Sequence, residues 1–160
     1  MGLVLLWHCP TGGHLGHGGP EHSGQSVMEY HIEAGAKTRR YIESVMPSML
    51  TQLGLNRSRR LLVVKVDPDL QEMGTTIPLT GIDTFLVVLK PTRNWVTLGV
   101  TLAHELTHVA QFAQGLLKPT AKGTMWKGRL YKRNHPYLDQ PWEIQAFAKQ
   151  EIVFRRAIEL

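Results

Sequence analysis

The ten residues from Thr101 to Ala110 read TLAHELTHVA, and they decide how the rest of the chain is interpreted. They contain the pattern His-Glu-x-x-His, formed by His104, Glu105 and His108. On an α-helix, residues four apart lie on one face about one turn apart. Two imidazoles so placed can bind one zinc ion, and the neighbouring glutamate can reach a water on that ion. The stretch therefore predicts a metal-binding helix with Glu105 as the catalytic base.

The residues around this motif indicate that its helix is buried. We expect the helix to be capped by Thr92 or Asn94, to run to about Gln114 and to be closed by Gly115. A buried helix cannot readily enclose two histidines and a glutamate without partners, and a metal ion would supply them. The apolar residues of this expected helix are Trp95, Leu98, Leu102, Leu106, Val109 and Phe112.

A catalytic zinc usually has three protein ligands, so a third must come from downstream of the motif or from the N-terminal loop. Our choice is Glu143, which follows Pro141 near the start of the last expected helix. Proline suits the first helical turn, and a helix N-terminus favours a carboxylate. Asp139 and His135 remain alternatives, because zinc accepts either type of ligand.

The remaining patterns predict a small α+β domain. A capping-box spacing at Ser26 predicts a helix from there to about Leu53, kinked or interrupted at Pro47. Residues 61–66 and 83–89 are rich in β-forming residues and predict two strands, with a loop or short irregular strand at 70–81. Residues 116–140 are expected to be irregular.

The last helix should start at Pro141, and Ile144, Phe147 and Ala148 are expected to pack it against the core. We treat residues 1–160 as a single domain, with a Gly- and His-rich segment at 1–25 and the core at 26–160. The apolar residues of the last helix are Ile144, Phe147, Ala148, Ile152, Val153 and Ile158.

His104–His108 followed by Trp142–Phe147 (WEIQAF) resembles the minimal gluzincin pattern, in which a glutamate on a later helix completes a zinc site. Small bacterial and phage proteins of the SprT-like and ImmA/IrrE-like groups share this pattern, and the resemblance covers about residues 83–155. It implies a zinc-dependent metallopeptidase with a minimal zincin-like fold. In that fold the motif helix lies beneath a small sheet whose edge strand borders the cleft, a role for which residues 83–89 are the candidate. Gln111 and Gln114 stand where the metzincins continue toward a third histidine, which argues against that group.

The predicted chemistry uses Glu105 to take a proton from the attacking water and pass it to the leaving amine. Tyr131, His135 and Tyr137 are possible donors to the oxyanion, and Asp139 and Glu151 are possible acceptors behind the histidine ligands.

Three classes of function remain open. The first is a peptidase acting on a protein or peptide. The second is a zincin-fold structural or binding protein within a larger assembly, such as a phage particle. The third is a nucleic-acid-associated protein, suggested by a net charge of +5 and by basic residues near Trp126 and Tyr131. The intact Glu105 favours the first, because a structural metal needs no base.

Other features of the sequence bear on the location of the protein and on the role of its cysteine. It shows neither a standard signal peptide nor an apolar run that could span a membrane, so we expect a cytoplasmic protein, or a virion-associated one if phage-encoded. The single cysteine, Cys9, excludes an internal disulfide. Cys9 with His14 and His17 could bind metal, but so Gly-rich a loop favours a solvated segment.

Overall fold

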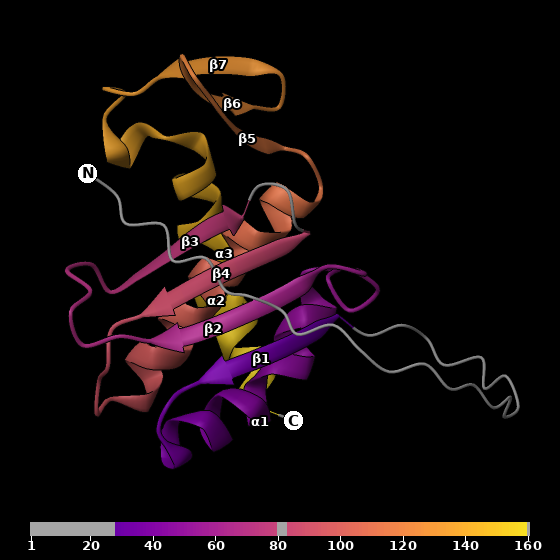
Figure 1. Ribbon diagram of the computed structural model, residues 1–160, viewed down its shortest axis with the longest axis vertical. Helices are drawn as coiled ribbons and strands as arrows, with labels where there is room; N and C mark the ends of the chain where they lie inside the picture. Colours follow the sequence, from indigo (N-terminus) through magenta and orange to yellow (C-terminus); the bar gives the residue numbers. More distant parts are fainter. Residues whose placement is uncertain (1–27, 80–82, 160) are drawn as a thin grey trace, which may run out of the picture.

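The computed structural model describes residues 28–79 and 83–159, and this part of the chain is an α+β structure (Figure 1). Its elements in chain order are β1 (Glu29–Glu33), α1 (Ala36–Gln52), β2 (Leu61–Val66), β3 (Gly74–Leu79), β4 (Thr84–Leu89), α2 (Trp95–Ala113), β5 (Leu117–Thr120), β6 (Gly123–Trp126), β7 (Arg129–Lys132), the short 3-10 helix η1 (Tyr137–Asp139) and α3 (Pro141–Ile158).

The larger sheet has four strands in the order β1-β2-β4-β3. Strands β1, β2 and β4 are parallel, whereas β3 lies antiparallel to β4 and forms one edge. The three helices lie on one side of this sheet (Figure 1). Because side chains alternate along a strand, Leu62, Val64, Phe85 and Val87 share the buried face and enter the main core.

Helix α2 is the centre of that core, as its apolar pattern predicts. The side chain of Asn94 accepts a hydrogen bond from the backbone N–H of Thr97, so Asn94 is the N-cap. Gly115 follows the helix with a φ of 71°, a left-handed conformation that glycine adopts without strain. The expected bounds of this helix are confirmed to within a residue.

Gly99 allows α2, α1 and α3 to approach one another closely. A Cβ atom built at Gly99 would overlap the ring of Phe154 on α3 and the hydroxyl of Tyr41 on α1. That hydroxyl donates a 2.7 Å hydrogen bond to the carbonyl of Trp95, which ties α1 to the first turn of α2.

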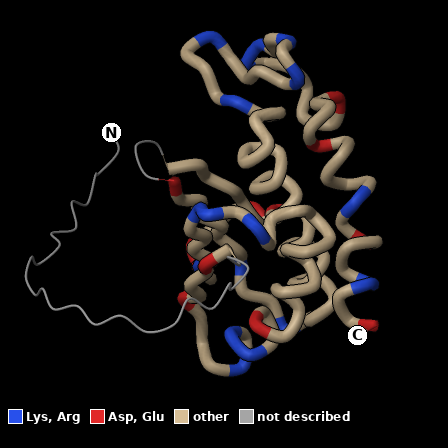
Figure 2. Tube along the Cα trace, turned by 90° about the vertical axis from the view of Figure 1, so that its right-hand side faces the viewer, with Lys and Arg blue, Asp and Glu red and all other residues tan. Residues whose placement is uncertain are grey.

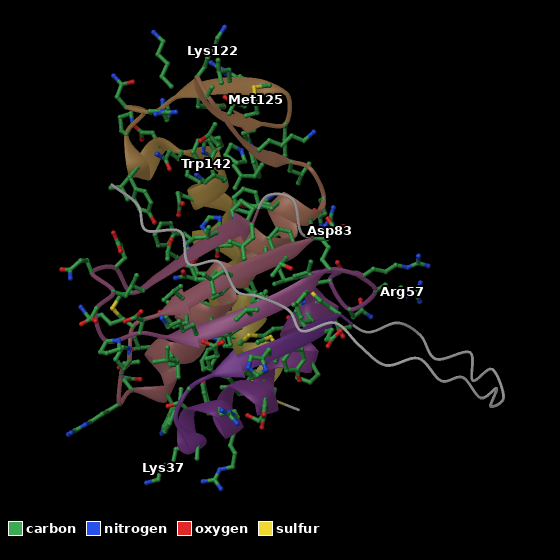
Figure 3. All side chains as sticks on the ribbon, viewed as in Figure 1. Lys37, Arg57, Asp83, Lys122, Met125 and Trp142 are labelled. Carbon is green, nitrogen blue, oxygen red and sulfur yellow. The ribbon has the colours of Figure 1, made fainter. Side chains whose placement is uncertain are left out.

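The smaller sheet, with the order β5-β6-β7, is antiparallel and packs on the start of α3. Trp126 and Leu117 are buried against Trp142, which Figure 3 labels between this sheet and the larger one. Lys and Arg residues gather at this end of the molecule (Figure 2). They are Lys118, Lys122, Lys127, Arg129, Lys132 and Arg133.

The expected helix from Ser26 to Leu53 was wrong in its first third. Ser26 lies outside the described residues, Glu29–Glu33 forms strand β1, and the helix begins only at Ala36. In β1 the side chains of Tyr30 and Ile32 turn toward the core while their neighbours are more exposed, which is a strand period of two. Pairing with β2, some thirty residues away in sequence, stabilises this strand and outweighs the local capping-box signal.

Pro47 does not interrupt α1 as expected, since the helix continues through it to Gln52. A proline inside a helix costs about 3 kcal/mol. Met46, Met49 and Leu50, which flank it, are at most 1% exposed. Burial of each such side chain contributes about 1.5–3 kcal/mol, which is enough to offset the cost of the proline.

Three further expectations are corrected or made more exact by the structure. Residues 116–140 are not irregular throughout, because they contain β5–β7 and η1. Of the loop or short irregular strand expected at 70–81, residues 74–79 form a regular strand, β3. The last helix does begin at Pro141, but Ile144 and Phe147 are 55% and 45% exposed and Ala148 is exposed as well, so the three do not pack into the core as predicted. The buried face of α3 is instead formed by Trp142, Glu143, Ala146, Val153, Phe154 and Ala157.

Within the described residues, no helix combines the length and the apolar character that a membrane crossing requires. The predictions that concern residues 1–25, including the possible metal site at Cys9, His14 and His17, lie outside the described residues.

The close approach at Gly99 leads to a first prediction. Gly99→Ala should destabilise the protein by about 1–3 kcal/mol, because overpacking a core costs more than the helix propensity of alanine returns. Denaturant unfolding measures this change. Val96→Ala on the same helix is the control, since Val96 is 58% exposed and its loss should alter stability by less than about 0.5 kcal/mol. Equal stability of Gly99→Ala and the native protein would contradict the packing described for α2.

Candidate metal centre

The ligand atoms of His104, His108 and Glu143 converge on one point. His104 Nε2 lies 3.1 Å from His108 Nε2 and 3.1 Å from Glu143 Oε2, and His108 Nε2 lies 3.3 Å from Glu143 Oε1. All three residues are at most 8% exposed. This buried group could hold a metal ion, and it consists of the three residues predicted as ligands.

Two helices place these side chains. His104 and His108 are one turn apart on α2, and their rings meet edge to face with centroids 4.8 Å apart. Glu143 stands in the first turn of α3, after Pro141. The backbone N–H groups of that turn have no partners within the helix, so its field favours an anion there.

Two glutamines lie behind the histidines, where the sequence suggested Asp139 or Glu151. His108 Nδ1 is 2.8 Å from Gln111 Oε1, and His104 Nδ1 is 3.0 Å from Gln150 Oε1. Gln111 was missed because it was considered only as a departure from another zinc-binding pattern. Its position three residues after His108 was the available signal, since residues at that spacing are neighbours on a helix.

Glu105 is held by the edge strand β3. The hydroxyl of Thr76 lies 2.7 Å from Glu105 Oε2 and donates to that carboxylate. A Cβ atom at Gly74 would come within 2.8 Å of Glu105 Cγ and Oε1, so glycine leaves the space that the carboxylate fills. Neither Gly74 nor Thr76 was predicted, because nothing near them in the sequence reveals that they face Glu105.

The two carboxyl groups of the site differ in acidity. Burial raises the pKa of Glu105 above its usual range, although Thr76 and the two imidazoles act in the opposite direction. Burial also raises the pKa of Glu143, but hydrogen bonding to His104, His108 and Tyr137 outweighs it and holds that pKa at about 2. Carboxyl groups whose pKa values are pushed apart in this way suit different roles. Glu143 suits an anionic ligand and Glu105 a group that exchanges a proton.

The structure places the other candidate residues, those considered as oxyanion donors or third ligands, in different surroundings. Tyr137 on η1 donates a 2.8 Å hydrogen bond to Glu143 Oε2. Tyr131 instead packs its ring against Trp142, and His135 contacts the Asp139 carbonyl. Neither His135 nor Asp139 belongs to the group of potential metal ligands, so of Glu143, Asp139 and His135, all of which the structure describes, only Glu143 meets the two histidines.

A cleft of about 660 Å³ exposes this site. Its walls come from β3, α2, β5, β6, η1 and α3. The edge strand that borders the cleft is β3 (Gly74–Leu79), whereas the strand expected there, β4, lies inside the sheet. The reason for the difference is that β3 folds back antiparallel along β4, a pairing that the sequence pattern did not reveal.

Among residues 28–79 and 83–159, no strand pairs with the outer edge of β3, which lies next to the site. The backbone N–H of Lys90 donates to the Met73 carbonyl, and bonded pairs alternate along an antiparallel ladder. With Gly74 opposite Leu89, this alternation directs the N–H and C=O groups of Gly74 and Thr76 away from β4. Pro78 has no N–H to offer, so the donors on this edge end before it.

Comparisons with protein-family models, with curated proteins and with solved structures gave no match to this chain.

The site leads to a prediction about metal content. After incubation with a zinc salt and removal of free ions, the protein should retain about one metal ion per chain by elemental analysis. Glu143→Ala and His108→Ala should lose it, because each removes one of three ligands. Glu151→Ala is the control: Glu151 is also an acid on α3, but it is exposed and should be dispensable. Full retention of metal by Glu143→Ala would assign the third ligand to another residue.

Proposed function

We propose that this protein is a zinc-dependent metallopeptidase with a minimal zincin-like domain. The observation that carries the proposal is the convergence of two imidazoles and a carboxylate in a cleft that also holds a separate, unliganded glutamate, Glu105. A structural metal site needs ligands alone, whereas a hydrolase also needs a base beside an accessible ion.

The donor set and its spacing suit zinc. With bonds of about 2.0–2.1 Å, neighbouring ligands of a tetrahedral zinc lie about 3.3 Å apart. The two histidine Nε2 atoms lie 3.1 Å apart, and each lies 3.1–3.3 Å from one of the two carboxylate oxygens of Glu143, which is close to that spacing. Nitrogen and oxygen donors of these types are common in catalytic zinc sites, where the fourth position is left to water or substrate.

Bound zinc would act as a Lewis acid that activates water and polarises a carbonyl group. The protein's own residues would perform the proton transfers. The carboxylate of Glu105 takes the proton of the attacking water and delivers it to the leaving amine. Its raised pKa favours this exchange, because a stronger base accepts a proton more readily.

Tyr137 is the residue best placed to stabilise the oxyanion of the tetrahedral intermediate. Its hydroxyl already reaches the ligand group, at 2.8 Å from Glu143 Oε2, and its side chain lines the cleft. Burial and the charge of Glu143 raise its pKa, so the phenol keeps its proton and remains a donor.

The edge of β3 would bind the peptide main chain. An extended substrate can pair with the outward-facing backbone groups of Gly74 and Thr76, in the way that strands add to an exposed sheet edge. This places the peptide alongside Glu105, which β3 itself holds through Thr76. The protein or peptide substrate would thus be recognised first by its backbone.

The competing functions have less support. Trp126 is 7% exposed and packs on Trp142, so it is not free to stack on the bases of single-stranded nucleic acid. A metal-bound structural or binding protein, for example within a phage particle, needs no counterpart of Glu105. The presence of Glu105 in the cleft beside the ligand group therefore favours an enzyme.

Glu105→Gln is the decisive variant for this proposal. It should keep its zinc, because Glu105 is not a ligand, and lose about 10²–10⁴-fold in rate, as expected for a missing general base. The rate is measured by hydrolysis of casein that carries self-quenched fluorescent labels, and the zinc content is measured by elemental analysis. Glu151→Gln, an exposed site on α3, is the matched control. An unchanged rate in Glu105→Gln would refute the assignment of the base, and a wild-type protein that binds zinc without cleaving peptides would support the binding protein.

Tyr137→Phe should lower kcat by about 10²–10³-fold with little change in KM, since an oxyanion donor acts mainly in the transition state. The control is Tyr131→Phe, whose ring packs on Trp142 away from the ligands. A Tyr137→Phe variant with native kcat would assign oxyanion stabilisation to another group.

A further inference from the structure

We propose that Gln111 is the residue that prepares His108 for metal binding: it holds a proton on Nδ1 and so presents an unprotonated Nε2 to the ion. Gln111 is 1% exposed, and it is not a ligand. The inference rests on the metal site of the proposed function, but not on peptide hydrolysis.

The orientation of the Gln111 amide follows from its partners. Its Nε2 lies 2.9 Å from the backbone carbonyl of Trp142 and 3.0 Å from Gln145 Oε1. A backbone carbonyl can only accept, so the atom facing it must be the NH₂ group. The carbonyl oxygen of the Gln111 amide is then the atom that faces His108, at 2.8 Å from Nδ1.

This orientation decides which ring nitrogen of His108 carries the proton. Because Gln111 Oε1 can only accept, the bond to it requires an N–H at Nδ1. In a neutral imidazole the other nitrogen, Nε2, then has a free lone pair. That lone pair points toward His104 Nε2 and Glu143 Oε1, which is where a metal ion would lie.

Gln111 also joins the two helices that supply the ligands. Trp142, whose carbonyl it holds, immediately precedes Glu143 on α3, while His108 lies one turn before Gln111 on α2. One buried amide thus links the position of the second histidine to that of the carboxylate. Ligands held in place before binding lose less entropy when the ion arrives.

Gln150 contacts His104 in a similar way but in a different setting. It is only partly buried and lines the cleft, where water can replace its hydrogen bond to His104 Nδ1. The structure therefore assigns the larger effect on metal binding to Gln111.

The test compares Gln111→Leu with the wild-type protein. Leucine fills most of the volume but cannot accept a hydrogen bond. Zinc affinity, measured by competition with a chromophoric chelator, should fall about 10–100-fold, the usual effect of losing an acceptor behind a ligand. The zinc affinity of Gln150→Leu should fall by a smaller factor. Gln114→Leu makes the same change at an exposed position one turn later and should bind zinc as the wild type does.

Nitrogen NMR of the histidine rings gives a readout that a purely structural role would not affect. In the metal-free wild-type protein at mildly alkaline pH, His108 should show a protonated Nδ1 and an unprotonated Nε2. This measurement needs no variant, so it holds even if Gln111→Leu fails to fold. A proton on Nε2 in the wild type, or wild-type zinc affinity in a folded Gln111→Leu, would overturn the inference.

The outcomes also separate this inference from the proposed function. A wild-type protein that binds no zinc would contradict both the inference about Gln111 and the proposed function. Zinc binding that depends on Gln111, without any peptide cleavage, would uphold this inference and leave the peptidase proposal without support.

Discussion

The rest of the structure depends on one constraint, the burial of two imidazoles and one carboxyl group, those of His104, His108 and Glu105, on the largely apolar helix α2. Polar groups withdrawn from water must find partners within the protein. Helix α3 brings Glu143 to the histidines, and strand β3 brings Thr76 to Glu105. Gly99 contributes at the other end of α2, because the absence of a side chain lets α3 and α1 pack closely. The positions of α3 and β3 therefore serve the site as well as the core.

The two carboxyl groups of the site differ in pKa, and this difference suits them to different chemical roles. Glu143 receives hydrogen bonds and lies beside imidazoles, so its charge is favoured despite burial. Glu105 is held by a single hydroxyl donor, and burial dominates its pKa. The same residue type thus serves as ligand in one place and as proton acceptor in the other. The environments that separate them come from different elements, the first turn of α3 and the edge strand β3.

The sequence predicted those parts of the protein that are encoded locally. His104, Glu105 and His108 were found by their spacing on one helix, and Glu143 by its place after a helix-starting proline. Strand β1 and the sheet β5–β7 were missed because pairing with distant or neighbouring strands, and not local propensity, stabilises them. Gly74 and Thr76 could not be found in this way, since only the fold brings β3 beside α2. The positions of Ile144, which is 55% exposed, and of Phe147, which packs against His104 and lines the cleft, were missed because an apolar residue on a helix does not reveal which neighbour it meets.

X-ray absorption at the zinc edge of the zinc-loaded protein tests the central claim most directly, because it reports the atoms bound to the ion and their distances. The account predicts a four-coordinate site with nitrogen and oxygen ligands only, at about 2.0–2.1 Å, and the multiple-scattering signature of two imidazoles. A six-coordinate ion without imidazole would contradict it, as would a sulfur ligand about 2.3 Å from the zinc, which Cys9 could supply.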